Sequence, residues 1–326
     1  MRSLVALLRS LRAERRLLPR LWPFARLLVR SRGTVPQPAV ASATFAASAA
    51  PARPAAGEHP LTVVSVIRNG VLNGYPFVEA YGSWGRWADR ILVVDGESTD
   101  GTREALAALA GLVPQLDVAS RPWPAQSVRG SAIAELSDTA VTLARDGSAR
   151  LMYVQADEIY AETQRELVRG WRDGALRFAG YVNFWNSMER VLANEPEFEL
   201  VRLLPPDAPA ASIGDGYSFD VGETPVTAVP ERVLHYGWCF PVNILRKHVS
   251  HAQLYPESPA YRLRGLLARR MLTTRSFDPD LLDALAPQYR PVPFAGEHPA
   301  CMRHLVGLSV YDPGVGLELL AKGVRW

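Results

Sequence analysis

A loop of small and acidic residues follows an apolar run near residue 95. The run Arg90-Ile-Leu-Val-Val-Asp95 ends in a carboxylate, and Gly96-Glu-Ser-Thr-Asp-Gly-Thr102 follows it directly. Ligands of open parallel sheets bind beyond the carboxyl ends of the strands. Asp95 is therefore placed to accept hydrogen bonds from a nucleobase or a ribose. The alternative interpretation is a tight turn whose Asp and Ser side chains satisfy backbone donors before a helix.

A second acidic cluster follows the apolar run Leu151-Met-Tyr-Val. Gln155, Asp157 and Glu158 come directly after this run. Adjacent carboxylates at a strand end suit a hard divalent cation, which would bridge the oxygens of a diphosphate and offset the charge on a departing nucleoside diphosphate. The alternative is a strand end at which Asp157 caps the next helix.

The first cluster resembles a known family once the preceding apolar run is included. The run Val63–Ile67 ends in Arg68-Asn69, and together with Asp95 and the loop to Thr102 it resembles the opening signature of the family 2 glycosyltransferases. The resemblance implies the A-type glycosyltransferase fold, a mostly parallel open sheet flanked by helices. It also implies that Asp95 contacts the base of a nucleotide-sugar. The other nucleotide-sugar-binding residues that it implies here are Arg68, Asn69, Glu97, Ser98 and Asp100.

The second cluster resembles the Asp-x-Asp metal motif of that family, with one departure. Gln155 stands where the first Asp is expected, and Asp157 matches the second. The resemblance implies a divalent cation, Mn²⁺ or Mg²⁺, held by Asp157, and a hydrogen bond from Gln155 to a ribose or a metal-bound water. A late histidine often completes this metal site, and we assign that role to His235. The alternative for His235 is a packed, hydrogen-bonded side chain beside aromatic residues.

Inverting sugar transfer requires a base that removes the proton of the acceptor hydroxyl. Asp215 is the first candidate because two glycines flank it in a loop that follows an apolar run ending at Leu204. Asp220 and Glu223 are close rivals. Each of the three could instead be a solvated residue of a surface loop.

Trp185 and Lys247 complete the predicted nucleotide-sugar site. Trp185 follows an apolar run and offers a ring face to the C–H groups of a sugar, although it could equally be a core residue. Lys247 closely follows His235-Tyr-Gly-Trp238 and supplies a cation for a diphosphate. A solvated surface charge is the default interpretation of a lysine.

Apolar runs alternate with helix-like stretches through the middle of the chain. The expected strands are 61–67, 90–95, 116–119, 151–155, 180–184 and 199–204. The expected helices are 75–87, 103–110, 131–145 and 162–172. Such alternation predicts an α/β domain whose mostly parallel sheet is covered by helices on both faces.

The first 58 residues differ in composition from the rest of the chain. Residues 1–33 carry nine arginines and one acid, with leucines at helical spacing. This pattern predicts a basic amphipathic helix for an anionic membrane surface, and a disordered extension is the alternative. Residues 34–58 form an Ala/Pro-rich linker. We expect a catalytic domain over 59–255 and a helical extension of it over 256–326.

Composition sets further limits on function. The net charge of +3 arises from the basic N-terminus, because the remainder of the chain is net acidic. A nucleic-acid partner is therefore not supported by the overall charge. Cys239 and Cys301 lack metal-site spacing and favour a reducing compartment. We therefore expect a cytoplasmic protein, peripheral at the inner face of the membrane through residues 1–33. A bacterial cell-envelope polysaccharide or a lipid-linked saccharide suits this setting as the acceptor.

Two other functions stay open at this point. A nucleotidyltransferase shares the layered sheet and the metal site, but it usually begins with a Gly-rich phosphate loop, which Val66-Ile-Arg-Asn-Gly-Val71 matches poorly. The second alternative function is that of a non-catalytic scaffold, which binds a sugar nucleotide or is recruited to a membrane. Gln155 in the metal motif and the basic N-terminus keep the scaffold open as an alternative.

Overall fold

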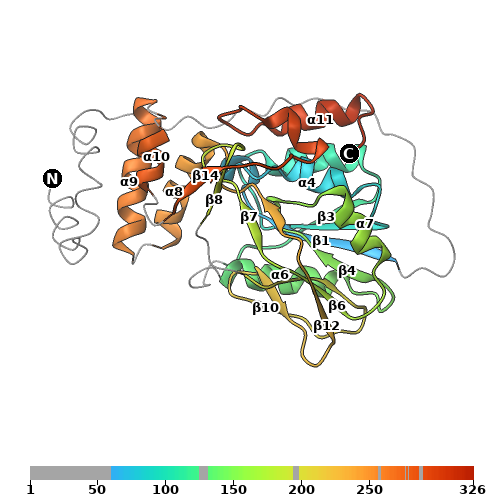
Figure 1. Ribbon diagram of the computed structural model, residues 1–326. Helices are drawn as coiled ribbons and strands as arrows, with labels where there is room; N and C mark the ends of the chain where they lie inside the picture. The colour runs from blue at the N-terminus through green and yellow to red at the C-terminus, as the bar shows by residue number, and fades with distance from the viewer. Residues whose placement is uncertain are drawn as a thin grey trace.

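The computed structural model describes most of the chain beyond residue 59 (Figure 1). The described residues are 60–124, 131–193, 198–255, 258–275, 277, 279–285 and 289–326. The basic segment 1–33 and the linker 34–58 predicted from the sequence lie outside them.

A seven-stranded sheet forms the centre of the fold, in the order β12-β6-β9-β4-β1-β2-β3. Strand β9 runs antiparallel to both of its neighbours, and the other neighbouring pairs are parallel. The predicted class, an α/β fold with a mostly parallel open sheet flanked by helices, is confirmed. The strands are β1 (Leu61–Ile67), β2 (Arg90–Asp95), β3 (Leu116–Ser120), β4 (Arg150–Tyr153), β6 (Ala175–Phe178), β9 (Leu200–Leu204) and β12 (Val226–Val229).

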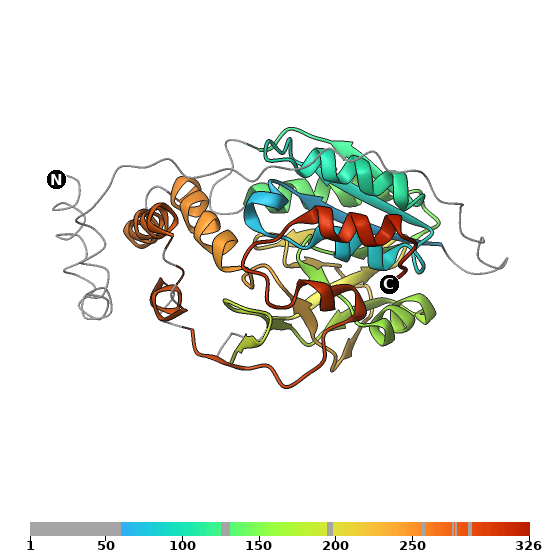
Figure 2. The ribbon, with the colours of Figure 1, turned by 90° about the horizontal axis from the view of Figure 1, so that it is seen from above.

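Helices cover both faces of this sheet, which explains why β1 is mostly apolar and buried along its whole length. Strands buried on both faces have continuous apolar runs, and all seven residues of β1 are buried. One face packs against α6 (Ser131–Ala144). The other packs against α4 and α5, and α11 lies over these two helices (Figure 2). The other helices around the sheet are α3 (Gly70–Asn73), α4 (Phe77–Trp84), α5 (Thr102–Leu112), α7 (Glu162–Gly170) and α11 (Pro313–Ala321).

Three small sheets bring distant parts of the chain to the edge of the large one. In the first, β13 (Val233–His235) lies between β5 (Glu158–Ile159) and β7 (Tyr181–Asn183). Its register places His235 opposite both Glu158 and Asn183. The other two are the hairpin β10 (Ala211–Ile213) with β11 (Ser218–Asp220), and the pair β8 (Arg190–Leu192) with β14 (Pro291–Pro293).

The C-terminal region contributes to two cores. Helices α8 (Pro241–Leu254), α9 (Pro259–Thr274) and α10 (Pro279–Leu285) share a separate apolar cluster at one end of the molecule. The 3-10 helix η3 (Ala300–Leu305) and α11 pack instead into the main core. No helix in the described part of the chain is long and apolar enough to cross a membrane.

Several predicted elements differ from the observed ones at their ends. The predicted helix 75–87 is shorter, because Pro76 occupies its N-cap and Gly85 its C-cap. Strand β4 ends at Tyr153, before the acidic cluster, so residues 155–157 form the turn that follows it. The two strands β6 and β12 were not expected, since β6 is only four residues long and most of β12 is exposed.

Candidate active site

The order in which the chain adds strands to the sheet reverses between β1 and β4. From β1 the order continues to β2 and β3 on one side, whereas β4 pairs on the other side. Ligands of open α/β sheets bind at such a switch point, beyond the carboxyl ends of the strands. Arg68 follows β1, Asp95 ends β2 and Asp157 follows β4, so the two predicted clusters meet at this edge.

Asp95 is buried and held by the loop that follows it. Its Oδ1 accepts a hydrogen bond from the Ser98 hydroxyl at 2.5 Å, and its Oδ2 accepts one from the Ser98 backbone N–H at 3.1 Å. The guanidinium of Arg103 lies 3.9 Å from Oδ2. Ser98 is buried as well, whereas Glu97 is exposed with φ of 57°. The loop thus fixes the Asp95 carboxylate at the strand end.

Asn69 and Asp100 join the loops that follow β1 and β2. The Asn69 backbone N–H donates to Ser98 Oγ at 2.8 Å, and Asn69 Oδ1 accepts from the Thr99 N–H at 2.9 Å. Asp100 Oδ2 accepts from the Leu72 N–H at 2.6 Å. These contacts give both residues a positioning role, and their direct contact with a nucleotide stays a prediction.

Arg68 lies over an aromatic ring beside this loop. Its guanidinium carbon is 4.8 Å from the centroid of Trp123. A side chain at Gly96 would come within 2.8 Å of the same ring, so this position requires glycine for close packing. Burial lowers the pKa of Arg68 although Glu97 and Asp95 oppose that shift.

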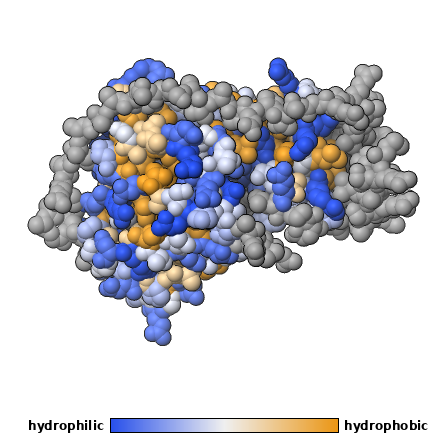
Figure 3. All heavy atoms as spheres, turned by 180° about the vertical axis from the view of Figure 1, so that it is seen from behind, coloured by the Kyte–Doolittle hydropathy of each residue, from blue (hydrophilic) through white to orange (hydrophobic). Residues whose placement is uncertain are grey.

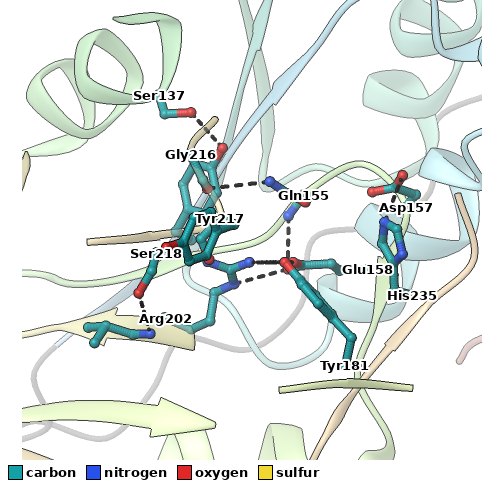
Figure 4. Close-up of polar contacts among 12 residues, drawn as sticks. Ser137, Gln155, Asp157, Glu158, Tyr181, Arg202, Gly216, Tyr217, Ser218 and His235 are labelled. Atoms are coloured by element: carbon teal, nitrogen blue, oxygen red, sulfur yellow. Dashed lines mark hydrogen bonds and ion pairs between the residues drawn. The ribbon is translucent and has the colours of Figure 1, made fainter. Parts of the chain in front are cut away.

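Asp157 faces an imidazole and an ammonium group. Its Oδ2 lies 3.2 Å from His235 Nε2 and 4.0 Å from Lys247 Nζ. Burial opposes ionisation of Asp157, but His235 and Lys247 more than offset this and lower its pKa. Burial likewise works against a charged His235, whose pKa is nevertheless raised by the Asp157 carboxylate. Figure 4 shows the two side chains pointing toward one another.

Asn183 fixes the orientation of the His235 ring. Its Oδ1 contacts Nδ1 of His235, and because an amide oxygen only accepts hydrogen bonds, Nδ1 carries a proton. Nε2 is thereby directed at Asp157. A metal-bound histidine is usually oriented in this way by its second nitrogen.

The donor atoms at Asp157 and His235 fit a divalent cation. One carboxylate oxygen and one imidazole nitrogen form a two-ligand set, and cations that serve diphosphates often take one or two protein ligands besides the phosphate oxygens. No group of three or more His, Cys, Asp or Glu within the described ranges has metal-site geometry. Gln155 is directed elsewhere, since its Nε2 donates to the Gly216 carbonyl at 3.3 Å.

Lys247 is buried between two aromatic rings. Its Nζ lies 4.2 Å from the centroid of Trp238 and 4.7 Å from that of Tyr75, and it donates to the Gly237 carbonyl at 3.2 Å. Burial lowers its pKa to about 8. Helix α8 brings it here because Asn243 donates hydrogen bonds to the carbonyls at the start of α3.

Glu158 holds the turn that carries Asp157. It is fully buried and forms an ion pair with Arg202, with Oε1 and Nη2 2.5 Å apart. Its Oε2 accepts from the backbone N–H of Gln155 at 3.1 Å, and Oε1 accepts from the Tyr181 hydroxyl at 2.7 Å. Figure 4 shows this network beside the Asp157–His235 pair. Glu158 is therefore a structural neighbour of the site, with its charge neutralised.

Asp215 lies at the tip of the β10–β11 hairpin, next to the Gly216 carbonyl that accepts from Gln155. It is exposed. Burial is the main cause of the pKa shifts of Lys247 and Tyr75. The negative charge of Asp215 has a smaller effect, which raises the pKa of both groups. Asp220 and Glu223 are exposed at and beyond the far end of the hairpin. Of the three candidate bases, only Asp215 lies at the hairpin tip, and a catalytic role for any of them stays a prediction.

Trp185 lies in the core, which is one of the two environments predicted for it. Its side chain is buried, its indole N–H donates to Asp283 Oδ1 at 2.9 Å, and its ring packs 5.6 Å from that of Trp238. Asp283 also accepts from Arg190 at 2.8 Å. Trp185 therefore joins α10 to the loop after β7, and a contact with a sugar remains a prediction.

Sequence reasoning missed four residues that shape the site. Asn183 and Tyr75 had no local signal, because each acts on a residue far away in sequence. Trp238 and Gly237 were visible in the motif around His235. A side chain at Gly237 would clash with Asp157 Oδ2 and approach His235 Nε2 to 3.1 Å.

Comparison with known proteins adds little to this geometry. No protein-family model matches the chain, and no curated protein matches it significantly. Among solved structures it is similar to the mannosyltransferase PcManGT from Pyrobaculum calidifontis in complex with GDP-Man and Mn²⁺, with 15% identity, a TM-score of 0.34, and coverage of 87% of this chain and 85% of that one. It is also similar to residues 1–349 of TarS from S. aureus, with 13% identity, a TM-score of 0.33, and coverage of 70% and 82%. Likenesses at these scores carry no argument about activity.

Proposed function

We propose that this chain is a nucleotide-sugar-dependent glycosyltransferase. It moves a sugar, with inversion, from a nucleoside-diphosphate donor to a saccharide or lipid-linked acceptor. One observation carries the proposal: at the switch point of the sheet, buried Asp157 faces both His235 and Lys247, and buried Asp95 ends a strand of the same edge. In this arrangement Lys247, with a cation at Asp157 and His235, would bind a diphosphate, and Asp95 would bind the attached nucleoside.

The donor lies across the carboxyl ends of β2, β1 and β4. Asp95 accepts hydrogen bonds from the base, and Arg68 over Trp123 borders that end of the site. The diphosphate lies near Lys247, whose ammonium offsets its charge. Asp157 and His235 are the residues that would hold a divalent cation, Mn²⁺ or Mg²⁺, and such a cation would supply positive charge against the leaving diphosphate. Tyr75 and Trp238 exclude water from the ammonium and so strengthen its field.

Asp215 is the base that takes the proton of the acceptor hydroxyl. Its carboxylate is exposed at the hairpin tip, so an acceptor hydroxyl would have access to it from solvent. In-line displacement places the base and the leaving diphosphate on opposite faces of the sugar carbon. Asp220 and Glu223 are too far along the hairpin for this role, because each strand residue adds about 3.4 Å.

The test is transfer of a radiolabelled sugar from a panel of nucleoside-diphosphate sugars to membrane-extracted or soluble saccharide acceptors. Asp215→Asn should lower kcat about 10²- to 10⁴-fold, the range for losing a general base, while nucleotide affinity stays unchanged. Asp220→Asn is the matched control and should retain turnover. Full turnover in Asp215→Asn would remove it as the base, and no transfer by the unmodified protein from any donor would contradict the proposed activity.

A further inference from the structure

Helix α9 presents two faces of different chemistry. Its inner face, which includes Leu263, Leu267 and Met271, packs in the apolar cluster that it shares with α8 and α10. Arg262, Leu266 and Arg269 are exposed. Their spacing of four and three residues places them in a single stripe on the outer face of the helix.

The outer stripe combines positive charge with an exposed apolar side chain. Residues 258–275 contain five arginines and no acid, and two of these arginines, Arg262 and Arg269, lie in the stripe. Arg264 instead lies near His248 and His251 of α8, where its charge helps burial to lower the pKa of both. Leu266 is 42% exposed and Phe277, just beyond the helix, is 37% exposed. Seen from behind, the molecule shows apolar and strongly hydrophilic side chains side by side over much of the face that is coloured (Figure 3).

We propose that the outer face of α9 docks on an anionic membrane surface. The arginines bind lipid headgroups, and Leu266 and Phe277 enter the boundary between headgroups and acyl chains. This is how basic amphipathic helices bind at interfaces without crossing them. Each arginine near such a surface contributes about fivefold to the partition coefficient, from the attraction of its charge to anionic lipid.

Charge and apolarity together favour lipid over other partners. The N-terminal segment 1–33 carries nine arginines, so its charge repels α9 and does not complement it. A purely polar polyanion such as a nucleic acid would leave Leu266 and Phe277 without an apolar partner. A lipid interface satisfies both kinds of side chain.

Docking through α9 also places the candidate active site near the membrane. Helix α8 packs along α9 and carries Lys247 at its other side. Membrane binding does not depend on the proposed activity, so the two can be tested separately. If both hold, the acceptor is a lipid-linked saccharide reached at the surface.

A fluorescent label at the docking face tests contact directly in the full-length chain. Cys239 and Cys301 are buried, so Leu266→Cys can be labelled selectively with an environment-sensitive dye. Val118→Cys is the matched control, because Val118 is equally exposed, at 42%, on the distant strand β3. With vesicles rich in phosphatidylglycerol, the label at 266 should shift to the blue and be quenched by a lipid-borne quencher. The label at 118 should do neither.

Charge variants provide the second measurement. Arg262→Gln combined with Arg269→Gln should lower partition into phosphatidylglycerol vesicles about 25-fold, and Arg86→Gln combined with Arg90→Gln, at the amino end of β2, should leave it unchanged. Pure phosphatidylcholine vesicles should bind weakly. A protein that ignores both kinds of vesicle, or that binds them while the label at 266 stays in water, overturns the proposal. So does binding to a soluble polyanion without binding to vesicles.

Discussion

The ammonium of Lys247 lies 4.0 Å from the carboxylate of Asp157, inside a wall formed by Tyr75 and Trp238. In the proposed site, we expect a buried cation at this distance from the candidate metal ligand to attract a diphosphate even before a metal binds. The proposed site would therefore have two sources of positive charge, namely the ammonium carried by α8 and a divalent cation held by Asp157 and His235.

Lys247→Met should weaken binding of a nucleoside diphosphate by about 1.5 to 3 kcal/mol, the range for hydrogen bonds to charged groups. It keeps most of the side-chain volume between the rings. Affinity for the corresponding nucleoside should not change, because that part of the ligand lies near Asp95. Calorimetry without added metal measures both. Lys322→Met, at the other lysine of the chain, is the control, and equal diphosphate affinity in the two variants would remove Lys247 from the site.

Gly237→Ala should lower turnover about 100-fold with the fold intact. The added methyl would clash with Asp157 Oδ2, and displacements of this size at a reacting group cost activity of that order. Gly170→Ala is the matched control, because a methyl there meets no atom within 4 Å. Circular dichroism checks the fold of both variants. Normal turnover in Gly237→Ala would show that the position of Asp157 does not matter.

Arg202→Met should destabilise the protein by about 3 to 5 kcal/mol. It leaves the fully buried charge of Glu158 without its partner, which is the costly way to break a buried ion pair. Arg90→Met removes an exposed pair with Asp117 and should cost less than about 1 kcal/mol. Urea unfolding measures both values. Similar midpoints for the two variants would mean that the Glu158 network does not hold the turn.

His248 and His251 should make the protein less stable in acid. Burial lowers the pKa of each to about 3, and neither ring nitrogen of His248 has a hydrogen-bond partner. Between their ordinary pKa near 6.5 and about 3, the unfolded chain binds protons that the folded chain does not, so stability falls as pH falls. His248→Phe should remove about 2 kcal/mol of the loss between pH 7 and 5. Urea unfolding at the two pH values gives the comparison, and an identical pH dependence in the variant would contradict it.

The central sheet could be predicted because its signal is local. The bounds of β1 and β2 match the expected runs to the residue, since strands buried on both faces are rich in apolar and β-branched residues. Strands β6 and β12 had no such signal. The meeting of Asp95 and Asp157 also followed from sequence, because both come at strand ends of one parallel sheet.

The rest of the site depends on contacts between distant segments. His235 reaches Asp157 only because β13 pairs with β5 and β7, and Lys247 reaches it only because α8 packs on α3. No local pattern encodes these pairings. Trp185 shows a different limit of sequence reasoning. An aromatic residue after a strand gives the same sequence pattern whether it binds a sugar or packs in the core. In the structure Trp185 is buried.

The most direct test of the proposed site is calorimetric titration of the full-length chain with nucleoside diphosphates, with and without Mn²⁺. At least one should bind, and Mn²⁺ should tighten it. Asp95→Asn should weaken binding by about 1 to 3 kcal/mol under both conditions, and Asp157→Asn should abolish only the gain from Mn²⁺. If no nucleoside diphosphate binds, or if both variants bind as the unmodified chain does, the nucleotide-sugar site is not at this edge of the sheet.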